Sequence, residues 1–151
     1  MEKTIVIIKP DGIQKKLVGE IIKRVETENL TISNLNIVKL TKEQVSELYK
    51  ESLKKFPQIK KEIIEYMTRE PLILMIIEGE NAIQKMRKIR GLSDPSKSPI
   101  GSVRRDFAVD QDMEELTKNG KVTKNVMHAS GNKEEVEFET KLFFGEENER
   151  H

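Results

Sequence analysis

The chain has 151 residues, of which 36% are hydrophobic and 35% charged, so one domain with a sizeable core is expected and a disordered chain is excluded. Its 27 Lys and Arg residues balance 26 Asp and Glu residues, which excludes a global field that recruits nucleic acid or a membrane surface. The chain lacks cysteine and has two histidines, His128 and His151, so neither disulfides nor a zinc site is expected.

The N-terminus and the apolar runs predict a cytoplasmic protein. Residues 1–3 lead directly into an Ile/Val run that is much too short for the core of a signal peptide. No apolar run approaches the length that a transmembrane helix needs. We therefore expect no membrane partner.

The first part of the chain alternates between strand and helix patterns. Residues 4–9 are β-branched and nearly all apolar, which predicts a buried strand that Pro-Asp-Gly at 10–12 ends. Apolar side chains recur at helical spacing over residues 18–25, and residues 31–40 predict a second strand. Thr41 then opens another helix, where a glutamine three residues on completes a capping box.

The middle of the chain contains its most apolar run, Leu72–Ile77, which predicts a central strand. Before it, helical spacing resumes after Phe56-Pro57 and continues to Met67. After it, Asn81 is expected to cap a helix, again with a glutamine at the third position. Residues 91–99 contain Gly, Pro and Ser and predict a loop.

The last third predicts a small helix, a short strand and a terminal helix. Asp110 is expected to cap a helix that stops at Gly120, the strand follows at Asn125, and a helix over 133–144 closes the fold. Without the extra helices the order is β-α-β-β-α-β, an α+β ferredoxin-like sandwich with helices on one face of an antiparallel sheet. We expect a single domain over residues 1–151, with a helical insertion at about 110–124.

One histidine and several charged residues do not fit a simple division into core and surface. His128 ends a short strand directly before a capped helix, where anions are readily bound, although such a histidine is more often structural. Lys9 ends an apolar strand, Arg87 shares the predicted buried face of its helix, and Arg104 lies in a turn. Glu139 shares the apolar face of the last helix, where a carboxylate needs a partner. Together they form three cations and an inward carboxylate without obvious partners.

Six segments resemble, in order, those of nucleoside diphosphate kinases. They are Lys9-Pro10-Asp11-Gly12, Tyr49, Arg87, Gly91-x-Ser93-x-Pro95, Arg104-x-Asp106-Phe107 and Asn125-x-x-His128-Ala129-Ser130. Glu139, eleven residues after His128, falls where that family has its histidine-orienting glutamate. The resemblance runs from about Lys3 to Phe144.

The resemblance implies an enzyme that moves the γ-phosphate of ATP onto His128 and then onto a nucleoside diphosphate, in a ping-pong reaction. It gives Glu139 the role of orienting the imidazole, with support from Ser130. The positions matched to phosphate contacts are Lys9, Tyr49, Arg87, Ser93 and Arg104. Those matched to the nucleoside are Asn125 and Lys9 at the ribose and Phe56 at the base.

The resemblance also implies Mg²⁺ bound mainly through the nucleotide phosphates, with no direct metal ligand in the protein. It implies a homo-oligomer, a hexamer or tetramer, in which the 91–99 loop contacts other subunits. The sequence departs from the family in having Ser93 in place of Thr, Gly131 in place of Asp, and a longer segment between Phe107 and Asn125. The spacing from Tyr49 to Phe56 also differs slightly.

Two other functions are compatible with parts of the sequence. An RNA-binding module shares the β-α-β-β-α-β order, but it needs aromatic residues on a central strand, and Leu72–Ile77 has none. A catalytically silent relative that binds nucleotides or partners is the second alternative, although every matched catalytic position is filled.

For the insertion, one hypothesis is that it docks at the base side of the nucleotide and favours amino-bearing bases. The other is that it is a solvated loop without effect on catalysis.

Overall fold

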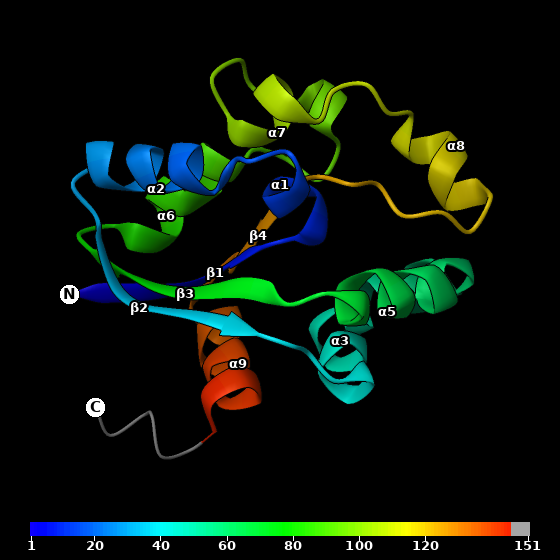
Figure 1. The fold of residues 1–151 in the computed structure, drawn as a ribbon, viewed down its shortest axis with the longest axis horizontal. Coiled ribbons are helices and arrows are strands. Elements are labelled where there is room, and N and C mark those ends of the chain that lie inside the picture. Colours follow the sequence, from blue (N-terminus) through cyan, green and yellow to red (C-terminus); the bar gives the residue numbers. More distant parts are fainter. Residues whose placement is uncertain (146–151) are drawn as a thin grey trace.

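The computed structural model describes residues 1–145, so His151 lies outside the described part. Four strands form one sheet in the order β2-β3-β1-β4, and each neighbouring pair is antiparallel. The strands are β1 (Glu2–Ile8), β2 (Thr31–Val38), β3 (Leu72–Gly79) and β4 (Met127–Ala129). The predicted ferredoxin-like order of strands is confirmed, with the most apolar run as a central strand (Figure 1).

Helices cover both faces of this sheet, so the prediction of a single covered face is wrong. α2 (Val18–Thr27) and α6 (Ala82–Arg90) lie above the sheet in Figure 1. α3 (Lys42–Leu48) and α9 (Lys133–Phe144) lie below it, and the core on that side also includes α5 (Lys60–Arg69). The physical reason is that β1 and β3 carry apolar side chains on both faces, which a second layer of helices removes from water.

The shorter elements correct two boundaries. They are α1 (Pro10–Gln14), α4 (Lys50–Lys55), α7 (Val103–Phe107), α8 (Met113–Lys118) and the 3₁₀ turns η1 (Pro57–Ile59) and η2 (Pro95–Lys97). Residues 10–12 begin a helix, because Pro10 stands at its first position, where its fixed φ is compatible with a helix. Asp112 caps α8 by accepting a hydrogen bond from the Glu115 N–H at 3.1 Å, so the prediction of Asp110 as the cap is wrong.

The predicted capping box at Thr41 is confirmed, because its hydroxyl accepts from the Gln44 N–H and the Gln44 side chain accepts from the Thr41 N–H. The similar box predicted at Asn81 is wrong. Asn81 is the residue before α6, but it has a left-handed backbone with φ of 54° and makes no side-chain cap. The carboxylate of Glu2 accepts the Ile83 N–H at 2.8 Å, so a distant residue caps this helix.

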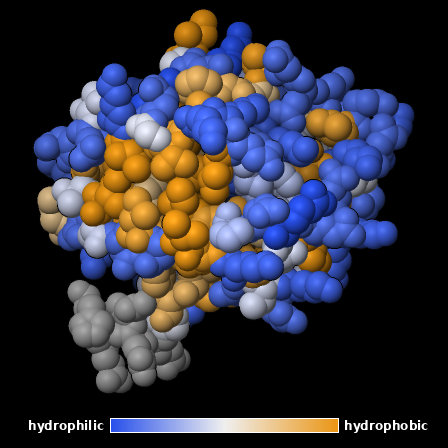
Figure 2. Space-filling view, in the orientation of Figure 1, coloured by the Kyte–Doolittle hydropathy of each residue, from blue (hydrophilic) through white to orange (hydrophobic). Residues whose placement is uncertain are grey.

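Apolar side chains gather on the face of the molecule drawn in Figure 2, the orientation in which β2 is in view. Leu35 and Ile37 on this edge strand are 45% and 74% exposed. Leu92 and Ile100, in the loop after α6, are also exposed. Among residues 1–145, no helix is both long enough and apolar enough to cross a membrane.

Candidate active site

The ends of β1 and β4 bring Lys9 and His128 together. Ile7 pairs with His128 across the two strands, and the Lys9 N–H donates to the Val126 carbonyl at 2.8 Å. Side chains alternate along a strand, so Met127 and Ala129 pack in the core under α2 and α6. His128 therefore points to the opposite face, where α9 lies.

A strained turn separates Asn125 from β4. Val126 has φ of 76°, a conformation that β-branched residues rarely adopt. Helix α1 holds this turn in two ways, because the Asp11 carboxylate accepts the Val126 N–H at 3.0 Å and Gly12 lies against the Val126 carbonyl. A Cβ at Gly12 would come within 2.8 Å of that oxygen. Strain that the surroundings impose in this way is typical of functional sites.

One carboxylate fixes the orientation of His128. Glu139 is 3% exposed, and its Oε1 lies 2.8 Å from His128 Nε2 and 2.7 Å from the Ser130 hydroxyl, which donates to it. A carboxylate accepts, so Nε2 carries the proton and Nδ1 keeps its lone pair. The ring is thus held with its Nδ1 lone pair available to bind an electrophile.

Lys9 is a buried cation in contact with two other predicted site residues. Its ammonium donates to Asn125 Oδ1 at 2.7 Å and lies 5.5 Å from the centre of the Tyr49 ring. Burial, and then the positive charge of Arg104, lower the pKa of Lys9 to about 7. The same burial raises the pKa of Tyr49, so its hydroxyl stays protonated as a donor.

Arg104 connects the chain segments around the site. Its guanidinium donates to the carbonyls of Leu92, Asn125 and Met127 at 2.9, 3.2 and 2.7 Å. Burial, followed by the charge of Arg90, lowers its pKa to about 9. Arg104 therefore adds positive charge to the site while fixing the 91–99 loop against β4.

A cavity of about 570 Å³ opens over these residues. Eight of the predicted site residues line it: Lys9, Tyr49, Phe56, Arg87, Ser93, Arg104, Asn125 and His128. The other two, Ser130 and Glu139, lie behind His128. Arg87 is exposed in this cleft, so its predicted place on a buried helix face is wrong. The arrangement combines an oriented nucleophile with several cations, as an anionic substrate requires.

Comparison of the chain with known protein families gives a match over nearly its whole length. The family model described as nucleoside diphosphate kinase matches residues 2–149. The chain belongs to the nucleoside diphosphate kinase family. The resemblance inferred from its motifs is thereby confirmed, and the chain is an enzyme of the phosphotransferase class.

Relatives in this family match nearly the whole chain. The nucleoside diphosphate kinase of Picrophilus torridus is 35% identical over 146 residues, covering 97% of this chain and 96% of its own. The crystal structure of an NDP kinase from Pyrobaculum aerophilum superposes with a TM-score of 0.83 at 29% identity, covering 97% of both chains. That of Halobacterium salinarum, in complex with CDP, gives a TM-score of 0.79 at 28% identity over 97% of this chain and 89% of its own.

The structure of this family member adds two charged residues that sequence reasoning missed. Arg90 donates to the carbonyls of Gly91 and Ala129 at 3.0 and 2.6 Å, and it lines the cleft. Glu135 also lines the cleft and accepts the Gly131 N–H. A Cβ at Gly131 would lie 2.3 Å from the Glu135 carboxylate, so this carboxylate occupies the space that a side chain at 131 would need.

Proposed function

We propose that the chain transfers the γ-phosphate of a nucleoside triphosphate, such as ATP, to nucleoside diphosphates through a phosphohistidine at His128. The observation that carries this proposal is the hydrogen bond of 2.8 Å between His128 Nε2 and Glu139, which leaves Nδ1 free to attack. Donor and acceptor nucleotides use one cleft in turn, so the kinetics are ping-pong and the products maintain the pools of triphosphates.

In the first half-reaction, the Nδ1 lone pair forms a bond to the γ-phosphorus. The bond from that phosphorus to the β–γ bridging oxygen breaks, and the leaving diphosphate keeps the electron pair. Negative charge collects on the phosphate oxygens, where positioned cations stabilise it. Lys9, Arg87 and Arg104 supply this charge, and the hydroxyls of Tyr49 and Ser93 donate hydrogen bonds. The second half-reaction reverses these steps with a different diphosphate.

The nucleoside is held further out in the cleft. Asn125 and Lys9, already joined by a hydrogen bond of 2.7 Å, contact the ribose. Phe56 is 40% exposed, which leaves its ring available for stacking on the base. Stacking uses a π-face that every base has, so this contact alone gives low base selectivity.

We expect Mg²⁺ to be bound mainly through the nucleotide. Among residues 1–145, no group of three or more His, Asp or Glu side chains could hold a metal ion. The ligands of Mg²⁺ would be mainly the phosphate oxygens of the nucleotide. Glu135 is a carboxylate that lines the same cleft, and it would help to hold such a cation. When bound, Mg²⁺ neutralises charge on the phosphates.

Three further expectations complete the proposal. Residues 1–151 form one domain, and the segment at about 110–124 is an insertion. The chain forms a homo-oligomer, which the exposed Leu35, Ile37 and Ile100 side chains support. Its location is the cytoplasm, and its partners are nucleotides. A silent relative is disfavoured because His128 is already oriented by Glu139 in the structure.

Incubation with γ-labelled ATP tests the phosphohistidine. The wild-type protein is expected to carry a label that is stable to alkali and lost in acid, and GDP should then remove it as labelled GTP. His128→Ala should take up no label while still binding ATP in calorimetry. Label retained by this variant would contradict the assignment, and binding without label in the wild type would identify the silent relative.

A further inference from the structure

A second cavity, of about 900 Å³, adjoins the cleft that His128 lines, but His128 does not line it. We call it the outer cavity. Both cavities are lined by Phe56, Ser93, Met113 and Thr117, so these four residues form the boundary between them. Met113 and Thr117 are one helical turn apart and share one face of α8. Helix α8 therefore forms a wall of the nucleotide cleft as well as of the outer cavity.

Hydrogen bonds fix this wall at both ends of the segment. The Gln111 side chain donates to the carbonyls of Ala108 and Lys124 and accepts the Lys124 N–H at 2.7 Å, which closes the base of the segment. Gln58 of η1 donates to the Thr117 carbonyl at 3.2 Å. With few apolar side chains, α8 cannot fold alone, and these bonds hold it in place.

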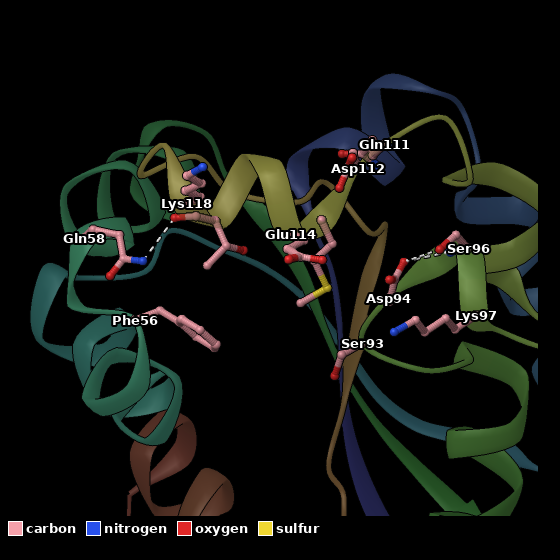
Figure 3. A pocket seen from close by; sticks show the side chains of 12 residues that line it. Phe56, Gln58, Ser93, Asp94, Ser96, Lys97, Gln111, Asp112, Glu114 and Lys118 are labelled. Atoms are coloured by element: carbon pink, nitrogen blue, oxygen red, sulfur yellow. Dashed lines mark hydrogen bonds between the residues drawn. The ribbon is translucent and has the colours of Figure 1, made fainter.

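The side chains in the outer cavity suit the edge of a nucleobase. Figure 3 shows the Phe56 ring and the Glu114 carboxylate both directed into the space between α8 and the loop that carries Ser93. Asp94 and Asp112 already accept hydrogen bonds from Ser96 and from the Glu115 N–H. The Glu114 carboxylate makes no hydrogen bond or ion pair with the rest of residues 1–145. The outer cavity therefore contains the exposed ring of Phe56 and the unpaired carboxylate of Glu114.

We infer that α8 forms the outer wall of the base site, with Met113 facing the base and Glu114 accepting hydrogen bonds from its edge. This inference rests on the proposed function, and it adds a base preference that stacking on Phe56 does not supply. Guanine presents an imino N–H beside an amino group, and a carboxylate accepts both at once. Adenine and cytosine offer one amino group. Uracil and thymine place carbonyl oxygens on either side of their N–H, which repel a carboxylate.

The test uses Glu114→Gln and the matched control Glu115→Gln. Glu115 is the next residue on α8, but its carboxylate accepts from Asn119 and it lines a different cavity. Isolated phosphoenzyme of each protein is mixed rapidly with GDP, ADP, CDP or UDP, and kcat/KM is measured for each acceptor. In Glu114→Gln the ratio of GDP to UDP should fall about tenfold, because a charged acceptor is lost. In Glu115→Gln the ratio should equal that of the wild type.

An unchanged ratio in Glu114→Gln, or an equal fall in both variants, would overturn the inference. Failure of the proposed function looks different, because then the wild type would form no phosphoenzyme. In that case calorimetric dissociation constants for the same four diphosphates replace kcat/KM, and the same order of bases is expected. Met113→Ala provides a second readout, since it should weaken all four diphosphates to a similar extent.

Discussion

In the proposed reaction, the Glu139 oxygen that accepts from both His128 and Ser130 leaves Nδ1 as the attacking nitrogen. Glu139→Gln keeps the size of the side chain but replaces a charged acceptor with a neutral one. We expect kcat to fall by about 10- to 100-fold, as for other partners that orient a reacting group, with little change in nucleotide affinity. Steady-state kinetics with ATP and GDP measure both quantities.

Glu137→Gln is the control for this prediction, because Glu137 is an exposed carboxylate on the same helix. It should leave kcat unchanged. Normal turnover in Glu139→Gln would make Glu139 a structural residue of α9, and a large loss of affinity would place it in contact with the nucleotide.

The lowered pKa of Lys9 predicts that the protein takes up a proton when it binds a nucleotide. With a pKa of about 7 in the free protein, much of the Lys9 side chain is neutral at pH 8. Phosphates next to it favour the ammonium, so they raise its pKa and the complex binds a proton from solution. Apparent affinity should therefore be highest below pH 7 and fall as the pH rises above it.

Calorimetry of ADP binding at pH 8 in two buffers with different ionisation enthalpies measures this proton uptake. Lys9→Arg is the comparison, because a guanidinium stays charged and takes up no proton at this pH. Equal proton uptake in both proteins would show that another group titrates.

The residues of the site could be predicted to different degrees. His128, Lys9 and Arg104 belong to short motifs, and the structure brings them into one cleft. The face of Arg87 was predicted from helical spacing, which cannot distinguish a buried face from one that borders a cleft. Arg90 belongs to none of the motifs, and its partners are the backbone carbonyls of Gly91 and Ala129. The sequence alone therefore gave no reason to select it.

At the scale of elements, helix caps made by residues close in sequence could be predicted, whereas a cap made by a distant residue could not. The Thr41 cap depends on a residue three positions away, and it was predicted correctly. The cap of α6 comes from Glu2, which accepts from the Ile83 N–H, 81 residues along the chain, where no local pattern could reveal it. The end of α8 at Gly120 was also predicted from residues close in sequence.

Gly120 ends α8 through two hydrogen bonds that are characteristic of helix C-termini. Its N–H donates to the Thr117 carbonyl, and the Lys121 N–H donates to the Leu116 carbonyl at 2.7 Å. Gly120 has φ of +71°, and a Cβ there would lie 3.0 Å from the Gln58 carbonyl. Gly120→Ala should therefore lower the free energy of unfolding by about 1 to 2 kcal/mol and shift α8 away from η1.

Denaturant unfolding of Gly120→Ala measures this cost. Gly19→Ala is the matched change in α2, where no neighbouring atom lies within 4 Å and φ is helical, so it should stabilise the protein by about 0.5 to 1 kcal/mol. Equal effects of the two substitutions would contradict the account of Gly120.

At the scale of the whole molecule, the topology followed from the order of patterns, but the number of helical layers did not. Alternation of strands and helices predicted β-α-β-β-α-β, and the sheet has that order. The continuous apolar runs of β1 and β3 indicated burial on both faces, and the extra helices α3 and α5 provide the second layer. The prediction counted those helices as additions to the β-α-β-β-α-β order, so it did not assign them to the core.

The exposed edge of this sheet leads to a prediction about assembly. Ile37 is 74% exposed on β2, next to Leu35 on the same face of the strand. Burying an isoleucine between subunits stabilises an interface by about 1.5 to 3 kcal/mol, and a symmetric dimer contains it twice. Ile37→Lys should therefore shift the proposed oligomer toward smaller species in light scattering after gel filtration. Thr31→Lys adds the same charge at an exposed position of β2 and should keep the wild-type mass. Unchanged mass in Ile37→Lys would place the subunit contact elsewhere, and Ile100→Lys, in the loop after α6, would then identify it.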